Sequence, residues 1–283
     1  MRYFYKLIFL SFFICSINLV VSDEVKSEEC SIVVGGAITE GSANNSCQSE
    51  PSGYGIVAYK LYLCTAAPTA PTTTTVTDLA SCEIAFEEES GSSVTLSTGA
   101  SVNLGGTQSL PPTGVYTHGV MHMNNTFAIT AKKEFEVAYN GQVSGSGRVC
   151  VTADGAGASG STGDSNDRTI CGDSTLTAGT YTESLTSFDN PFNATATENN
   201  VAGTGANITA YLIDTNEFLA VNDADVNNLL GVVEFASAAN ITASTTNVEI
   251  SFNVGEGMSI DGDGISGDMY MGSGPFQATI STN

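Results

Sequence analysis

The chain has 283 residues, of which 30 are acidic and only eight are basic, so its formal net charge at pH 7 is −22. A surface of this charge repels nucleic acid and anionic membranes, which argues against both as partners. Tryptophan is absent and glycine occurs 30 times, a composition typical of extracellular β-structure with many turns.

Residues 1–22 have the organisation of a secretory signal peptide. Arg2 and Lys6 form a basic start, Leu7–Val21 is largely apolar, and Ser22 precedes acidic residues. The apolar stretch is short for a membrane span, which favours cleavage over an uncleaved anchor, and no later segment is apolar enough to cross a membrane. We therefore expect a secreted or cell-surface protein, periplasmic or extracellular. Its mature region, 23–283, forms one large β domain or two subdomains with a boundary near 150–200.

Six cysteines remain in the mature region. An even number behind an export signal predicts three disulfides, and six cysteines allow about 15 connectivities. The spacing groups them into three neighbouring couples, and the enclosed segments are poor in bulky apolar residues. The CxxC or Cys/His clustering of a metal site is missing. The simplest pairing is Cys30 with Cys47, Cys64 with Cys82, and Cys150 with Cys171.

Runs of apolar, aromatic and β-branched residues, bounded by turn residues, predict short strands about every ten residues. They include Gly55–Leu63, Val115–Met123 and Asn207–Ile213. No segment keeps an apolar period of 3.6 residues over three turns, which argues against helices. We expect an all-β protein, most simply antiparallel β-sandwiches held by disulfides, with long Gly/Ser/Thr-rich loops such as Ala153–Asp167.

The segment between Cys64 and Cys82 combines small residues, Pro68, Pro71 and a run of four threonines. Prolines hold the backbone extended and threonines favour extended conformations, so the segment does not pack as a helix. A disulfide across its base would close a displayed surface loop.

Several segments carry a resemblance to known sequences: "YKLYLCTAAPTAPTTTTVTDLASCEIAF", "YTHGVMHMNNTFAITAKKEF", "GSGRVCVTADG" and "CGDSTLTAGTYTESLTSFD". They resemble secreted β-rich proteins of marine bacteria of the alphaproteobacterial type, a group without an assigned activity. The resemblance covers most of the mature region. It implies an exported protein and supplies no functional residues.

A candidate calcium loop lies in "GMSIDGDGISGDMYMG". Asp261, Asp263 and Asp268 offer the oxygen ligands and glycine-kinked backbone that Ca²⁺ prefers. The full EF-hand pattern fails, since Ile265 stands at its fifth position and Gly272 at its twelfth. A charged turn between strands is the alternative. Apart from this possible structural calcium, no cofactor is predicted.

Catalytic signatures are missing: there is no GxSxG, HExxH, Walker or dinucleotide-binding motif. His118 and His122 are the only histidines. On a strand they would lie about 13 Å apart, too far to share a metal ion. Tyr54, Tyr59 and Tyr181 are candidates for a sugar-binding platform, although sugar platforms commonly also use tryptophan.

The sequence thus favours a non-enzymatic extracellular or cell-surface protein with a structural or interaction role, such as a surface-layer or appendage subunit. Its partners would be further copies of itself or an extracellular ligand. The first alternative is a β-sandwich module that binds carbohydrate or another ligand, and the second is a secreted hydrolase.

Overall fold

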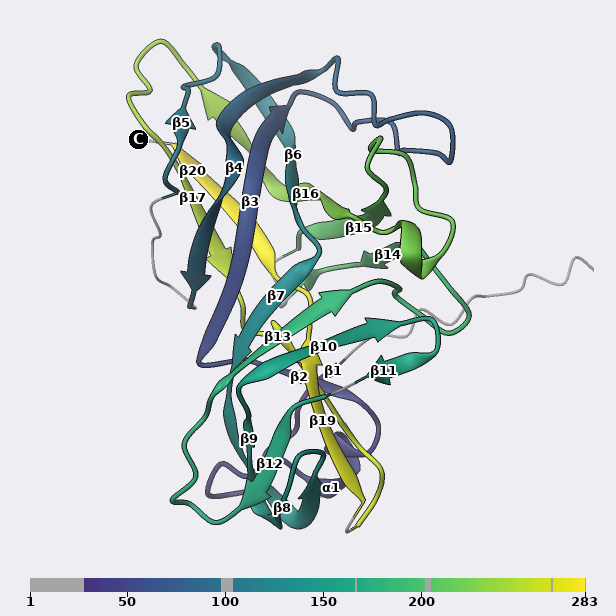
Figure 1. Cartoon of the computed structure of the whole chain (residues 1–283). Helices are drawn as coiled ribbons and strands as arrows, with labels where there is room; N and C mark the ends of the chain where they lie inside the picture. Colours follow the sequence, from purple (N-terminus) through teal and green to yellow (C-terminus); the bar gives the residue numbers. More distant parts are fainter. Residues whose placement is uncertain (1–27, 98–103, 166, 202–204, 266, 283) are drawn as a thin grey trace, which may run out of the picture.

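The computed structural model describes residues 28–97, 104–165, 167–201, 205–265 and 267–282 (Figure 1). The expected signal peptide lies outside these residues. Strands dominate the described chain, which confirms the all-β class. Helical structure is sparse among the described residues: α1 (Glu40–Ala43) and η2 (Asp223–Asp225) are single turns. No helix among the described residues is long and apolar enough to cross a bilayer.

Most strands belong to two large sheets, which we call the main sheet and the second sheet. The main sheet has eleven strands, in the order β11 (Gly163–Ser165), β10 (Gly155–Gly160), β13 (Thr180–Leu185), β7 (Thr126–Thr130), β3 (Gly53–Cys64), β6 (Gly114–Asn124), β16 (Asn228–Ile241), β15 (Asn207–Ile213) and β14 (Thr195–Glu198), with β4 (Cys82–Leu96) and β5 (Thr107–Gln108) branching from β3.

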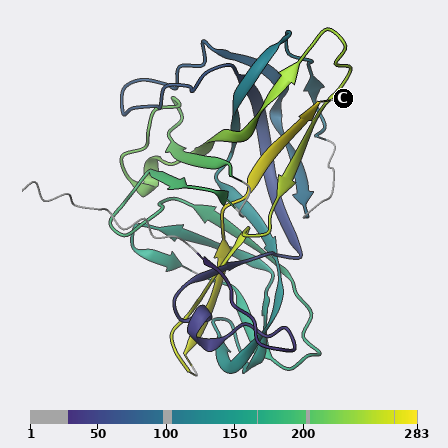
Figure 2. The ribbon, with the colours of Figure 1, turned by 180° about the vertical axis from the view of Figure 1, so that it is seen from behind.

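The second sheet has seven strands, in the order β1 (Glu28–Glu29), β2 (Cys47–Ser49), β18 (Met258–Gly262), β19 (Asp268–Ser273), β8 (Lys132–Gly141), β9 (Ser146–Thr152) and β12 (Thr169–Gly172). A two-stranded ribbon of β17 (Val248–Asn253) and β20 (Gln277–Thr282) completes the fold. Seen from behind, this ribbon lies in front of the main sheet, and β20 contacts β16 (Figure 2).

The sequence predicts antiparallel sheets, but both large sheets also contain parallel strand pairs. Three pairs of the described strands are parallel: β1 with β2, β10 with β13, and β19 with β8. The Gly- and Ser-rich segment expected to be a loop supplies β10 and β11. Its backbone pairs with β13 and needs no bulky side chains to do so. Parallel pairing requires a crossover connection rather than a tight turn, and alternating apolar patterns do not reveal it.

All three predicted disulfides are confirmed. They join Cys30 to Cys47, Cys64 to Cys82, and Cys150 to Cys171. The second closes a loop at the ends of β3 and β4, where the two cysteines are direct cross-strand partners. Most of that loop is exposed, and the Thr65 N–H bonds the Ser81 carbonyl at 2.9 Å across its base. The loop is therefore displayed, as its composition predicts.

The chain crosses repeatedly between the two large sheets. β3 to β7 lie in the main sheet, β8 and β9 in the second, β13 to β16 in the main sheet again, and β18 and β19 back in the second. One hydrophobic core cluster extends from Phe135 and Cys150 to Phe86 and Ile241. A domain boundary between residues 150 and 200 would therefore place β18 and β19 in a different subdomain from β8, although β19 pairs with β8.

A fork in the main sheet positions the candidate site. β6 and β7 both pair with β3, on the side away from β4. β16 pairs with β6, whereas β13 pairs with β7. At the junction, Asn125 Nδ2 donates to the Leu185 carbonyl at 3.0 Å, and the Leu185 N–H donates to the Asn125 carbonyl at 2.8 Å. The main sheet thus has two wings beyond β3, one of β6, β16, β15 and β14 and the other of β7, β13, β10 and β11 (Figure 1).

Candidate ligand-binding cavity

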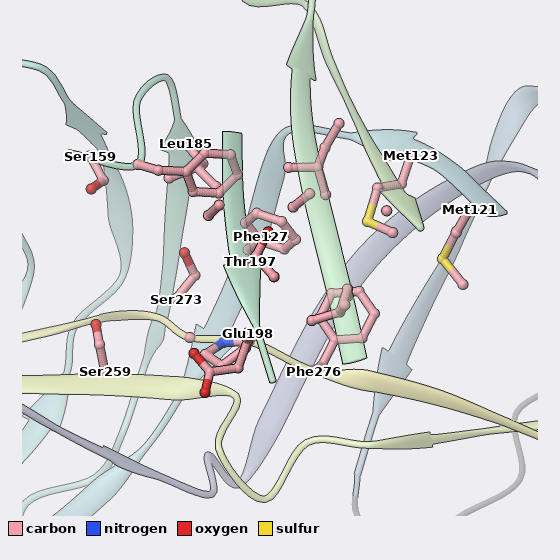
Figure 3. Close-up of a pocket in the computed structure, with 18 of the residues that line it drawn as sticks. Met121, Met123, Phe127, Ser159, Leu185, Thr197, Glu198, Ser259, Ser273 and Phe276 are labelled. Atoms are coloured by element: carbon pink, nitrogen blue, oxygen red, sulfur yellow. The ribbon is translucent and has the colours of Figure 1, made fainter. Parts of the chain in front are cut away.

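A cavity of about 300 Å³ lies within this fork, and Figure 3 shows the side chains around it. One wall comes from β6, β16 and β15, another from β7 and β13, and the chain between β19 and β20 forms a third. The lining is mainly apolar, with contributions from Met121, Met123, Phe127, Leu185, Ile208 and Leu229.

The alternation of side chains along β6 explains its part of the wall. Met121 and Met123 line the cavity, whereas His122 between them points to the other face of the sheet. Methionine is flexible and polarisable, so such a wall adapts to ligands of different outline.

Gly231 on β16 keeps the cavity open. It lies between Leu230 and Val232 in a strand, where a larger residue would be expected. A β-carbon built at Gly231 would meet only the Cδ1 atom of Ile208, at 3.9 Å, which is ordinary contact. The cavity thus extends to the backbone of β16, and a glycine within a strand often marks such a close approach.

An aromatic group closes the cavity toward the core. Phe276 packs against Tyr54 with 5.4 Å between ring centroids and against Phe127 with 6.5 Å. The Tyr54 hydroxyl donates to the Gly274 carbonyl at 3.1 Å. Burial, and to a smaller extent the carboxylate of Glu183, raises the pKa of Tyr54 well above its ordinary value. The phenol therefore stays neutral and acts as a fixed donor.

The cavity is polar at one end. Figure 3 places three serine hydroxyls and a carboxylate toward one side and three apolar side chains toward the other: Ser159, Ser259, Ser273 and Glu198 against Met121, Met123 and Phe276. Gln48 also lines the cavity, and its Oε1 atom is buried without a hydrogen-bond partner. Buried polar atoms of this kind are rare in proteins and commonly meet a water or a ligand.

Gln48 is held by backbone pairing and by a neighbouring disulfide. It lies on β2, where its carbonyl accepts from the Cys30 N–H at 2.8 Å and its Cα partner on β18 is Ser259. The next residue toward the N-terminus, Cys47, is bonded to Cys30. The disulfide therefore fixes the strand that carries the unpaired acceptor.

The predicted calcium residues lie on the hairpin of β18 and β19, away from this cavity. The Asp263 N–H donates to the Asp268 carbonyl at 3.0 Å, and Asp261 lies across from Tyr270. Among the described residues, no group of three or more His, Cys, Asp or Glu side chains is placed to hold a metal. The hairpin geometry adds no support to the calcium site, which stays a prediction.

The other sequence candidates are dispersed. His118 Nδ1 lies 2.8 Å from the Thr117 hydroxyl, while His122 packs against Tyr59 with 5.6 Å between ring centroids. Tyr54 and Tyr181 are 1% and 0% exposed. The prediction that they form an exposed sugar platform with Tyr59 is therefore wrong, because alternation along β3 and β13 turns both rings into the core.

Of the cavity residues, the sequence singled out Tyr54, and it did so for an exposed sugar platform rather than for a buried cavity. The one local signal was a glycine between apolar residues in a strand at Gly231. No family model matches the chain, and no curated protein or solved structure shows significant similarity to it.

Proposed function

We propose that this protein is a secreted or cell-surface binding protein that holds a small, largely apolar molecule in the fork of the main sheet. The observation that carries the proposal is the apolar cavity of about 300 Å³, left open by Gly231. Natural ligand sites are concave, mainly apolar and furnished with a few polar groups. The three disulfides suit an oxidising, extracellular location.

The volume of the cavity sets the size of the ligand. A dry cavity of about 150 Å³ binds benzene, so this one suits a molecule of roughly ten to fifteen non-hydrogen atoms. At about −0.5 kcal/mol per atom, ten atoms correspond to a Kd of roughly 0.2 mM. A sugar fits less well, since its hydroxyl groups would lose hydrogen bonds to water against the apolar walls.

The proposal can be tested by methyl NMR with butylbenzene as the probe. In protein labelled with [methyl-¹³C]methionine, the Met121 and Met123 methyl signals should shift on titration. Met269, which is buried in the second sheet, serves as an internal control. Gly231→Leu fills the cavity and should abolish the shifts. Unchanged signals in the unsubstituted protein, or equal shifts in the Gly231→Leu variant, would overturn the proposal.

A second candidate function, self-association at a cell surface, is favoured by an exposed apolar turn. Ile32 and Val34 are 66% and 107% exposed. The turn is held within the chain, because the Val33 N–H donates to the Ala37 carbonyl at 2.8 Å. Sedimentation velocity of the unsubstituted protein and of an Ile32→Ser, Val34→Ser variant tests this candidate. Concentration-dependent assembly that the variant loses would support it, and a monomer throughout would remove it.

A further inference from the structure

We infer that the cavity selects ligands whose polar end donates hydrogen bonds and carries no negative charge, a primary ammonium ahead of a hydroxyl. This inference rests on the proposed function and concerns the polar end of the same cavity. It follows from the acceptors there, from the way the nearby donors are occupied, and from the local charge.

The first step is the unpaired acceptor. Gln48 is 5% exposed as a residue, its side chain lines the cavity, and its Oε1 atom has no hydrogen-bond partner. A buried acceptor without a partner destabilises the protein until a donor reaches it. A ligand that places an N–H or O–H group at this end would satisfy Oε1, whereas a carboxylate would bring a second acceptor toward it.

The second step is that two nearby donors are already in use. The Ser273 N–H donates to the carboxylate of Glu183, which is itself buried. The Ser187 hydroxyl donates to the Asp189 carbonyl at 2.7 Å. Neither group is available to a bound anion. The hydroxyls of Ser159 and Ser259 can rotate to accept from a ligand as readily as to donate.

The third step is charge. Glu198 lines the cavity, and no lysine, arginine or histidine is among its described lining residues. The chain as a whole carries a net charge of −22. An anionic head would lose its hydration without gaining a counter-ion, while a cation would be attracted by the carboxylate. The polar end therefore disfavours carboxylates, even though its serines alone would tolerate them.

A matched ligand series tests the inference. Butylbenzene, 4-phenylbutan-1-ol, 4-phenylbutan-1-amine and 4-phenylbutanoate share one apolar body and differ at the polar end. With the Met121 and Met123 methyl signals as readout, the amine should bind most tightly, about tenfold or more above the carboxylate. The alcohol should fall between them. Competition against butylbenzene establishes that all four occupy one cavity.

Two variants identify the groups responsible. Glu198→Gln removes the charge at nearly constant volume and should lower amine affinity about threefold to tenfold while leaving the alcohol unchanged. Gln48→Met removes the acceptor and should lower the affinity for 4-phenylbutan-1-ol to about that for butylbenzene. Glu198 lies on the edge strand β14, so its variant keeps the test available if Gln48→Met does not fold.

The possible outcomes separate the two proposals. Tightest binding of 4-phenylbutanoate, or equal binding of all four probes, would overturn the inference and leave the proposed function standing. Absence of binding by all four, butylbenzene included, would overturn the proposed function itself. An amine affinity that Glu198→Gln leaves unchanged would also contradict the inference, because the preference for the ammonium would then arise elsewhere.

Discussion

The hydroxyl of Tyr54 donates to the carbonyl of Gly274 at 3.1 Å, across 220 positions of the sequence. Tyr54 lies on β3 in the main sheet, and Gly274 follows β19 of the second sheet. This contact joins the two sheets at the edge of the cavity, and the neighbouring Phe276 ring packs on the same tyrosine. A change at Tyr54 should therefore affect both the stability of the fold and the shape of the cavity.

Tyr54→Phe should lower the free energy of unfolding by about 1 to 3 kcal/mol, because it leaves the partly buried Gly274 carbonyl without its donor. Burial raises the pKa of Tyr54 in the folded state. The contribution of its hydroxyl to stability is therefore complete below the unfolded-state pKa of about 10 and is lost as pH rises above that value. Urea unfolding at pH 8 and at pH 10.5 measures both effects. The difference between the two proteins should shrink at the higher pH, and a constant difference would contradict the assignment.

Filling the cavity from β16 should stabilise the protein. Gly231→Val replaces a glycine within a strand by a β-branched residue and adds apolar contact with Ile208, which together should raise the free energy of unfolding by about 1 kcal/mol. Gly55→Ala is the matched control, because its β-carbon would lie 2.8 Å from that of Ala128. This clash should cost about 1 to 3 kcal/mol. Equal destabilisation by both variants in thermal unfolding would show that Gly231 does not face open space.

The sequence predicted local features well and the cavity not at all. Spacing alone identified the three disulfides, since each couple encloses a segment without a core of its own. The dipeptide Asn140-Gly141 is typical of a type I′ hairpin turn, but here Asn140 pairs with Ser146 and the reversal lies at residues 142–145, where Gly145 has a φ of 81°. That choice depends on which residues pair across β8 and β9, and the turn dipeptide does not determine it.

The cavity could not be foreseen because its walls meet only in the folded chain. Gln48, Met121, Glu198 and Ser273 lie on β2, β6, β14 and β19. Each looks ordinary in its own segment. In particular, Gln48 Oε1 lacks a hydrogen-bond partner because no donor on the surrounding strands reaches it. That is a property of tertiary packing rather than of local sequence.

Removing the Cys30–Cys47 disulfide should weaken ligand binding as well as stability. The double variant Cys30→Ala, Cys47→Ala frees the strand that holds Gln48, whereas Cys150→Ala, Cys171→Ala alters only β9 and β12. The sequence separations are 17 and 21 residues, so loop entropy predicts a similar loss of about 3 kcal/mol for each. Urea unfolding measures that loss, and titration with 4-phenylbutan-1-amine measures affinity.

Only the first double variant should bind the amine more weakly, and by about threefold or more, since one hydrogen bond to the head group is at stake. The second variant is the control for a general loosening of the fold. If both variants lose the same affinity, the disulfide next to Gln48 has no special part in placing it. If neither does, β2 is held by its backbone pairing alone.

His122 should make the protein sensitive to mild acid. Burial lowers the pKa of His122, Lys60 lowers it further, and the carboxylate of Glu217, 3.9 Å from Nδ1, partly opposes them. Below about pH 6.5, the ordinary pKa of histidine, the unfolded chain binds a proton at His122 more readily than the folded state does. Stability therefore falls as pH falls below this value. Replacing the imidazole by His122→Gln should remove this part of the pH dependence.

The measurement is the free energy of unfolding in urea between pH 4.5 and 7.5. At each pH, the value for His122→Gln is subtracted from the value for the unsubstituted protein. Carboxylates common to both proteins cancel in this difference, which should decrease toward low pH. Glu217→Gln supplies the opposite test. It removes the group that favours the charged imidazole, so the loss of stability in acid should become steeper. A flat difference, or a shallower loss in Glu217→Gln, would show that the buried face of His122 is better solvated than its packing against Tyr59 and Lys60 implies.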